Sequence, residues 1–285
     1  MEKTAALLKK TEDCEKWKKL FELGQAEWKT LYLDPDTGKT RSMDTQTSYA
    51  VPLALEITDP EITEKMAERL DVCCKREASD DEGNLHLAYS LMTGFIGTAW
   101  ISQALSNAGY HETAWRMLKQ EDYLSWLYPV KQGATTIWER LNSYTVERGF
   151  GGNNSMNSFN HYSFGAVGSW ILGYAGGIRR SNAGIFEVCP VPDPDGDVTW
   201  AKMQMHTVQG TFKVSWNRKE NGFCYYIHIP GGKKTVVSIL NPSGKEIFIN
   251  GTILKNTVEI SDVMEKNGCV QFIAVPGDYE ICTVC

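Results

Sequence analysis

The chain has no apolar run long enough to cross a membrane. A transmembrane helix needs about 20 consecutive apolar residues, and polar or charged residues interrupt the 285-residue sequence well before that length is reached. Residues 1–28 alternate charged and apolar side chains at helical spacing and contain no signal-peptide core. We therefore expect a cytoplasmic protein that does not interact with a membrane.

The sequence also lacks a cluster of basic residues. It has 29 Lys and Arg against 35 Asp and Glu, a net charge of −6. Proteins that follow the phosphates of nucleic acids need a stripe of basic side chains, so nucleic acid is excluded as the main partner. The 42% hydrophobic and 22% charged residues are typical of a globular protein, and the length allows two domains.

The eight cysteines do not form the pattern of a disulfide framework. Cys73 and Cys74 are adjacent within a helical pattern, and Cys14 lies in another helical segment. Without an export signal, reduced thiols are expected. Cys282 and Cys285 form a C-x-x-C at the end of the chain, but no second ligand pair stands at a matching spacing. We therefore expect no metal and no cofactor.

The spacing of apolar residues differs between the two parts of the chain. Up to about residue 185 the apolar residues recur at helical spacing, with a helix start predicted at Asp59–Pro60 and Gly-rich and Ala-rich residues at 163–178. Beyond that point, apolar and polar residues alternate as in strands, with a hairpin turn at Asn221–Gly222. We predict a helical domain at 1–185 and an antiparallel β-sandwich, resembling a jelly roll, at 186–285.

Glu139 has two readings from its local sequence. Thr136-x-x-Glu139 fits a capping box, in which the glutamate side chain accepts a hydrogen bond at the start of a helix. On local sequence alone this structural role is the more probable one. His161 is equally compatible with a packed loop residue, and Tyr162 with a core residue. The alternative is a sugar site, because the helical part is rich in tryptophan and tyrosine.

A set of ordered motifs carries a specific resemblance. They are TQTSYAVPLAL at 45–55, LMTGFIGT at 91–98, SWLYPVKQGATTIWERLNS at 125–143 and SFNHYSFGAVGSWILGYAGGI at 158–178. In this order they strongly resemble the C-terminal part of the bacterial α-L-rhamnosidases, family 78 of the glycoside hydrolases. The resemblance is close over roughly residues 40–185. It implies the second part of an (α/α)6 helical toroid followed by a β-sandwich.

The resemblance implies an activity and a set of site residues. Members of the family hydrolyse terminal α-L-rhamnosides with inversion, which requires a general acid and a general base. Glu139 matches the family's general base, and His161 matches a histidine that contacts the rhamnose. Trp138 is expected to pack behind the base. Asn160 and Tyr162 flank the histidine and complete the predicted substrate-binding set, so the expected partner is a rhamnose-containing glycoside.

The family's general acid has no counterpart in this sequence. In the family it lies upstream, in the early helices of the barrel, and the helical part here is about half as long as the complete barrel requires at ~11–12 residues per helix. We therefore expect either a fragment or a homo-oligomer that completes the ring. Leu53, Leu55 and Ile57 are expected to belong to an apolar face that such an assembly covers.

Two other functions stay open from the sequence. A sugar-binding remnant would use the same residues without turnover. A polysaccharide lyase would use Asn160, His161 and Tyr162 together, although adjacent side chains point in different directions. The acidic residues of the predicted sandwich are expected at turns or strand ends and without a catalytic role; they are Glu220, Glu246, Glu259 and Glu265.

Overall fold

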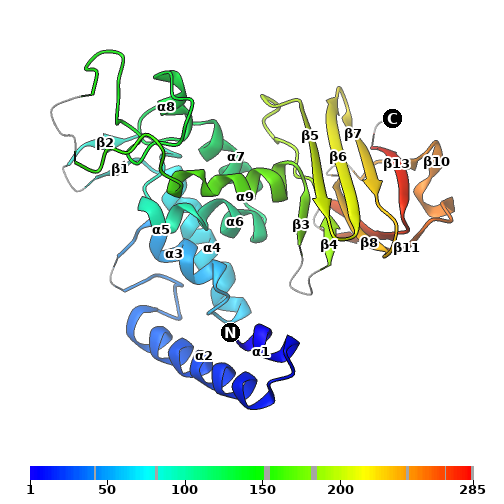
Figure 1. Ribbon diagram of the computed structural model, residues 1–285, viewed down its shortest axis with the longest axis horizontal. Helices are drawn as coiled ribbons and strands as arrows, with labels where there is room; N and C mark the ends of the chain where they lie inside the picture. Colours follow the sequence, from blue (N-terminus) through cyan, green and yellow to red (C-terminus); the bar gives the residue numbers. More distant parts are fainter. Residues whose placement is uncertain are drawn as a thin grey trace. The chain divides into compact units, whose positions relative to one another are not determined.

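The computed structural model describes residues 1–41, 43–80, 83–150, 155–180, 185–241, 244–266 and 268–283. By compactness the chain divides into two units, Met1–Phe164 and Gly165–Cys285. The first unit is helical, and the second is a β-sandwich preceded by a short helical segment (Figure 1). The predicted fold class, helices followed by a sandwich, is confirmed. The predicted domain boundary after residue 185 stays a prediction.

The first unit is built from short helices and one small hairpin. Its elements are α1 (Glu2–Leu7), α2 (Thr11–Tyr32), α3 (Gln46–Ala54), α4 (Pro60–Lys75), β1 (Ala78–Ser79), β2 (Leu85–His86), α5 (Gly94–Thr98), α6 (Ile101–Asn107), α7 (His111–Lys119) and α8 (Leu127–Lys131). Pro60 is the first residue of α4, as predicted from Asp59–Pro60. The side chains of Thr45 and Ser48 form a capping box at the start of α3.

Helix α3 is the centre of this unit and packs against α4, α5 and α6. The surrounding core consists of fully buried side chains that include Tyr49, Met66, Leu70, Ile101, Leu105 and Met117. Full burial of one such side chain contributes roughly 1.5–3 kcal/mol. The same helix holds a loop, because the Gln46 side chain donates to the carbonyl of Ser90 (2.8 Å) and accepts from the amide of Met92 (2.9 Å).

The first two helices bury much less apolar surface than the others. The helical segment expected at 4–32 is interrupted by Lys9, whose φ of 54° breaks the helix between α1 and α2. No residue of α2 is buried, and Leu20 and Leu23 are 56% and 60% exposed. None of the described helices is both long and apolar enough to cross a bilayer.

The predicted apolar face at Leu53, Leu55 and Ile57 is exposed only in part. Leu55 is 50% exposed, whereas Leu53 and Ile57 are half-buried. Large apolar side chains of the first two helices are exposed as well: Leu7, Leu8, Leu20, Phe21, Leu23 and Leu31. The unit therefore presents more apolar surface to solvent than a closed helical core would leave.

The second unit contains two sheets. One has the strand order β10-β9-β13-β7-β6-β5 and the other β11-β12-β8-β4-β3, with every pairing antiparallel except the parallel β4–β8 pair. The strands are β3 (Ile178–Arg180), β4 (Phe186–Val188), β5 (Trp200–Thr207), β6 (Gly210–Lys219), β7 (Gly222–Ile229), β8 (Thr235–Leu240), β9 (Phe248–Ile249), β10 (Thr252–Ile253), β11 (Ile260–Lys266), β12 (Cys269–Ala274) and β13 (Gly277–Cys282). The hairpin predicted at Asn221–Gly222 joins β6 to β7.

Buried and outward-facing side chains alternate along the strands, and the buried ones form the core of the sandwich. In β6, Phe212, Val214 and Trp216 are buried, and the residues between them face outward. The indole N–H of Trp216 donates to the carbonyl of Ala175 (2.7 Å), which ties the preceding helical segment to the sheet. That segment was predicted as one helix at 163–178. It is instead a succession of three short helical types: 3₁₀ η1 (Ser163–Val167), α9 (Gly168–Trp170) and π-helical η2 (Ile171–Ala175).

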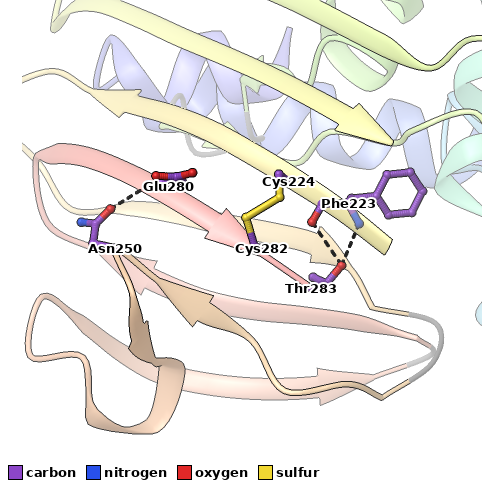
Figure 2. The surroundings of a disulfide bond; sticks show 6 residues. All are labelled: Phe223, Cys224, Asn250, Glu280, Cys282 and Thr283. Atoms are coloured by element: carbon purple, nitrogen blue, oxygen red, sulfur yellow. Dashed lines mark hydrogen bonds between the residues drawn. A yellow bond between two sulfur atoms is a disulfide. The ribbon is translucent and has the colours of Figure 1, made fainter. Parts of the chain in front are cut away.

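A disulfide links two neighbouring strands of the larger sheet. Cys224 of β7 and Cys282 of β13 lie directly opposite each other, with their Cα atoms 4.3 Å apart and their sulfur atoms bonded (Figure 2). The expectation that all thiols are reduced is therefore wrong for this pair. The physical reason is register: antiparallel pairing brings together two cysteines that are 58 residues apart in sequence. Cys285, the other half of the C-x-x-C, lies outside the described residues.

The strand end next to the disulfide is also fixed by hydrogen bonds. Thr283 donates its backbone N–H to the carbonyl of Phe223 (2.9 Å). Its hydroxyl accepts from the amide of Phe223 (3.0 Å) and donates to the carbonyl of the same residue (3.3 Å) (Figure 2). The disulfide and this pairing therefore hold the last described residues of the chain against β7.

Removing the disulfide is expected to lower the free energy of unfolding of the sandwich. We expect Cys224→Ser with Cys282→Ser to cost about 2–4 kcal/mol, because the cross-link restricts the unfolded chain. Urea unfolding followed by near-ultraviolet circular dichroism measures this. Cys269→Ser, which alters a cysteine outside the disulfide, is the matched control.

Dithiothreitol should lower the unfolding midpoint of the wild type to that of the double variant and leave the double variant unchanged. Free thiols at both positions in the untreated protein, detected by alkylation and mass spectrometry, would contradict the pairing.

Candidate functional site

A cavity of about 670 Å³ opens in the helical unit. Its walls come from the start of α3, the end of α4, the start of α5 and the loop that follows Trp138. Its lining includes charged side chains, a cysteine and an aromatic ring: Asp44, Cys73, Arg76, Glu77, Asp80, Phe95, Glu139 and Arg140. Clefts of roughly 300–1,000 Å³ are the size that holds small ligands.

Glu139 reaches this cavity from a loop segment. The segment pairs with residues about twenty positions later: the amide of Glu139 donates to the carbonyl of Ser158 (2.9 Å), and the amide of His161 donates to the carbonyl of Ile137 (2.8 Å). The Glu139 carboxylate accepts a further hydrogen bond, through Oε2, from the amide of Ser158 (2.9 Å). The W-E and N-H-Y motifs therefore lie side by side.

This pairing corrects the capping-box interpretation of Glu139. No helix begins at Thr136; the hydroxyl of Thr136 donates instead to the carbonyl of Phe159. The Glu139 carboxylate binds the amide of a distant segment rather than one at a helix start. The local pattern was misleading because a partner 19 residues away supplies the hydrogen bond.

Trp138 occupies the opposite side of the same segment. The Trp138 indole is buried and packs edge-on against Phe159 (ring centroids 5.2 Å apart) and Tyr144 (6.5 Å). It lies outside the cavity lining, whereas Glu139 is part of it. The aromatic cluster behind the segment supports the carboxylate.

His161 lies behind the cavity wall and does not line it. Its ring stacks on Phe95, a lining residue, with centroids 4.9 Å apart and an interplanar angle of 25°. Nδ1 of His161 accepts from the amide of Ser163 (3.4 Å). The histidine therefore positions an aromatic wall of the cavity.

Asn160 and Tyr162 also lie outside the cavity lining. Tyr162 is 85% exposed and stacks on His161 with centroids 5.5 Å apart, and Asn160 is exposed. Neither lines the cavity. None of Asn160, His161 and Tyr162 lines this cavity, and the lyase alternative stays a prediction.

Asp44 carries the best-defined charge in the cavity. It accepts from Arg76 (2.8 Å) and from the hydroxyl of Tyr49 (2.6 Å). Burial alone would raise the pKa of the Asp44 carboxyl, but the hydrogen bonds from Tyr49 and Arg76 and the Arg76 charge lower it below its ordinary value of 3.8. Burial and the bond to Asp44 in turn raise the pKa of Tyr49 to about 12. Asp44 is therefore ionised at neutral pH.

The cavity thiol is protonated at neutral pH. Burial, together with the negative charge of Asp44, raises the pKa of Cys73 to about 11. A thiol is a poor nucleophile in that state, so the site is not of the cysteine type. Among the described residues, no three His, Cys, Asp or Glu side chains come together as a metal site.

The sequence interpretation did not single out Asp44, Arg76, Asp80 or Phe95. Asp80 is held by His86 (2.9 Å to Nε2) and by the side chain and amide of Asn84. Two of these residues had a usable signal: Asp44 directly precedes the TQTSY motif, and Phe95 lies within T-G-F. Arg76 and Asp80 lie outside the motifs.

The Asp44 ion pair predicts a pH-dependent contribution to stability. We expect Asp44→Asn to lower the free energy of unfolding at pH 7 by about 1 kcal/mol, at the low end for charged hydrogen bonds because the carboxylate is partly exposed. The pKa of Asp44 is lower in the folded protein than its ordinary value of 3.8. The stabilisation is therefore complete above pH 3.8 and is lost as the pH falls from there through the folded pKa.

The wild type and Asp44→Asn should thus converge in stability on acidification, as measured by urea unfolding at pH 7 and pH 3. Asp36→Asn, at an exposed aspartate, is the control. A gap of equal size at both pH values would contradict the account.

Comparisons with known proteins match both units to one family. Residues 1–175 match the model of the bacterial alpha-L-rhamnosidase 6 hairpin glycosidase domain, and residues 177–252 match that of the bacterial alpha-L-rhamnosidase C-terminal domain. An alpha-L-rhamnosidase of Formosa agariphila is 29% identical over 279 residues, covering 98% of this chain and 29% of the relative. One of Streptomyces avermitilis is 33% identical over 211 residues, covering 74% of this chain and 19% of the relative.

Solved structures give the same result. The structure of the Streptomyces avermitilis alpha-L-rhamnosidase complexed with L-rhamnose superimposes with a TM-score of 0.82 at 26% identity, covering 98% of this chain and 25% of that one. The native enzyme of Aspergillus terreus gives a TM-score of 0.76 at 25% identity, covering 97% and 28%. The chain thus spans less than a third of the length of each of these relatives. Since the match of the helical unit extends over more than half of the chain, this protein belongs to the bacterial alpha-L-rhamnosidase six-hairpin glycosidase family.

Proposed function

We propose that this chain carries the general base of an α-L-rhamnosidase, which hydrolyses terminal α-L-rhamnosides with inversion at the anomeric carbon. The observation that carries the proposal is the position of Glu139: its carboxylate lines the cavity and is oriented by the amide of Ser158 through Oε2. The other oxygen, Oε1, accepts no hydrogen bond from a described residue. It is the atom that would hold the attacking water.

In an inverting hydrolysis, the task of Glu139 is to accept the proton of the attacking water. Water attacks the anomeric carbon from the face opposite the leaving group while its proton passes to Oε1, and the bond to the leaving oxygen breaks. The hydrogen bond from Ser158 keeps the carboxylate in one orientation, so less order has to be imposed during the reaction. Trp138 and the rings around it hold the segment from behind.

The remaining predicted residues take supporting or outer roles in this proposal. His161 holds the Phe95 ring in the cavity wall, and Phe95 offers an aromatic face to the sugar. Tyr162 and Asn160 are exposed outside the cavity and are available to the part of the glycoside beyond the rhamnose. The partner in this scheme is a rhamnose-containing glycoside.

We further propose that the general acid comes from outside the described residues. Asp44 is unsuited to the role because its lowered pKa keeps it ionised at neutral pH. A second copy of the chain, or the part of the family's length that this chain does not span, would supply the acid. A chain that binds rhamnose without turnover is the second candidate function, and the lining of Phe95, Arg76 and carboxylates suits it equally.

An activated substrate tests the base separately from the acid. A 2,4-dinitrophenyl α-L-rhamnoside has a leaving group that departs without protonation, so hydrolysis needs only the base. We expect Glu139→Gln to reduce its rate by roughly 10² to 10⁴, while glutamine preserves the bond to Ser158 through its amide oxygen.

Glu61→Gln, at an exposed glutamate in the first turn of α4, is the matched control and should retain the full rate. Wild-type activity in Glu139→Gln would remove Glu139 from the mechanism. Binding of L-rhamnose by calorimetry, with no turnover of the activated glycoside by the wild type, would favour the binding function.

Self-association is expected if a second copy completes the helical ring. The exposed apolar side chains of α2 provide the surface. We expect sedimentation velocity to show a concentration-dependent oligomer that Leu23→Glu weakens. Gln25→Glu adds the same charge on another side of α2 and should leave the association unchanged. A wild-type chain that is monomeric at high concentration would contradict the oligomer.

A further inference from the structure

The outer face of the larger sheet carries a hollow that the proposed hydrolysis does not use. Its volume is about 450 Å³, and it belongs wholly to the second unit. We call it the sheet-face hollow and define it by its outward-facing residues Lys202, Lys213, Ser215, Tyr226, His228 and Glu280.

Tyr226 lies at the centre of this hollow. Strand register places it beside Ser215 of β6 on one side and Glu280 of β13 on the other, with Lys202 of β5 next to Ser215. The tyrosine is 55% exposed, although aromatic side chains of this size usually bury most of their surface. An exposed ring in a row of polar side chains is therefore a candidate contact surface.

The charged groups around Tyr226 differ in whether they already have a partner within the protein. Asp278 is bonded to His228 (2.7 Å), and the negative charge of Glu280, together with hydrogen bonding to its carboxylate, raises the pKa of the Tyr226 hydroxyl. Lys202 and Lys213, by contrast, are exposed, and their side-chain ammonium groups form no ion pair or hydrogen bond with a described residue. The hollow thus has two unpaired positive charges on one side and partnered carboxylates on the other.

The acidic side of the hollow is held in place. The Asn250 side chain accepts from the amide of Glu280 (2.8 Å) (Figure 2). It also donates to the carbonyl of Asp278 (3.1 Å) and thereby bridges the backbone of β13. The disulfide of Cys224 and Cys282 links β7 to β13 (Figure 2). It lies two residues from Tyr226 on β7 and two residues from Glu280 on β13. The central aromatic and its neighbours are therefore preorganised.

A second exposed aromatic lies on the same face. Trp200 of β5 is 62% exposed and pairs with Asn217, which is opposite Cys224. Trp200 is two strands away from β7, and Tyr226 is two residues further along β7 than Cys224. The usual strand spacing and rise per residue therefore put the backbones of Trp200 and Tyr226 about 12 Å apart. A ligand that reaches both rings is longer than one sugar ring.

We propose that the sheet-face hollow is a second, non-catalytic binding site for an acidic oligosaccharide. The apolar face of a sugar ring stacks on Tyr226, whose ring face is electron-rich. A carboxylate of the saccharide pairs with Lys202 and Lys213, and hydroxyl groups bond to Ser215 and Glu280. The site is distinct from Glu139 and involves no covalent step, so it does not depend on the proposed hydrolysis.

The dimensions favour a saccharide over a folded protein. A specific protein interface buries about 800 Å² on each partner, whereas this hollow has the size of a small-ligand cleft. Its single central aromatic with polar groups on both sides differs from the apolar core of a protein interface. An acidic peptide would satisfy the lysines but has no ring face to stack on Tyr226.

Binding of trigalacturonate to the whole chain tests the proposal. We expect calorimetric binding that weakens at least about tenfold in Tyr226→Ala and severalfold in Lys213→Gln, and that weakens in about 0.5 M salt because the charges are exposed. Tyr226→Phe, which keeps the ring, should retain most of the affinity. Lys255→Gln, an exposed lysine elsewhere in the same unit, is the matched control.

Further probes define the ligand class and the place of binding. Neutral galactotriose should bind at least about tenfold more weakly than trigalacturonate, and triglutamate should not compete. Amide chemical shifts should change at Lys213, Tyr226 and Glu280, and Glu139→Gln should leave the binding unchanged. Absence of trigalacturonate binding, equal binding of triglutamate, or shifts confined to the Glu139 cavity would overturn the proposal, whatever the outcome of the hydrolysis assays.

Discussion

The candidate site depends on the pairing of two short loop segments, residues 137–139 and 158–161. Two backbone hydrogen bonds join them, and the Glu139 carboxylate adds a third by accepting from the amide of Ser158. Neither segment belongs to a helix or a named strand, so the position of Glu139 at the cavity depends on this pairing together with the packing of Trp138 behind it. A buried or half-buried backbone group without a partner costs about as much as a lost hydrogen bond, and the pairing avoids that cost while it places the carboxylate. The same interaction that stabilises the loop therefore orients the proposed base.

The two neighbouring side chains of this segment, Trp138 and Glu139, have different roles: one packs in the core and the other lines the cavity. Trp138 and the rings it contacts form a buried cluster, while Glu139 faces the cavity. On the facing segment, His161 stacks on Phe95 and thereby shapes the aromatic wall. Across the cavity, Arg76 and Tyr49 keep Asp44 ionised. Of these two lining carboxylates, Asp44 is neutralised by its ion pair with Arg76, whereas Glu139 is oriented by Ser158 and keeps one oxygen that can accept a bond from water. This difference is the reason to assign the role of base to Glu139.

The sequence allowed the two-part fold and the family to be predicted, because hydrophobic period and ordered motifs extend over most of the chain. It could not show the register of strands far apart in sequence. The Cys224–Cys282 disulfide and the row from Lys202 to Glu280 arise from that register. It also gave a wrong local interpretation at Thr136–Glu139, where a capping pattern competes with a tertiary partner 19 residues away. Arg76 and Asp80 lack a motif, and only the meeting of α4, β1 and the loop around Glu139 makes them neighbours.

The most direct test of the central claim is chemical rescue of Glu139→Ala by azide. Removing the carboxylate leaves space beside the anomeric carbon, and azide needs no base to attack from the face that water would use. If Glu139 is the base of an inverting reaction, azide restores cleavage of the 2,4-dinitrophenyl α-L-rhamnoside and nuclear magnetic resonance identifies the product as β-L-rhamnosyl azide. Failure of azide to restore cleavage in a folded Glu139→Ala protein whose parent is active, or formation of the α-azide, would contradict the account.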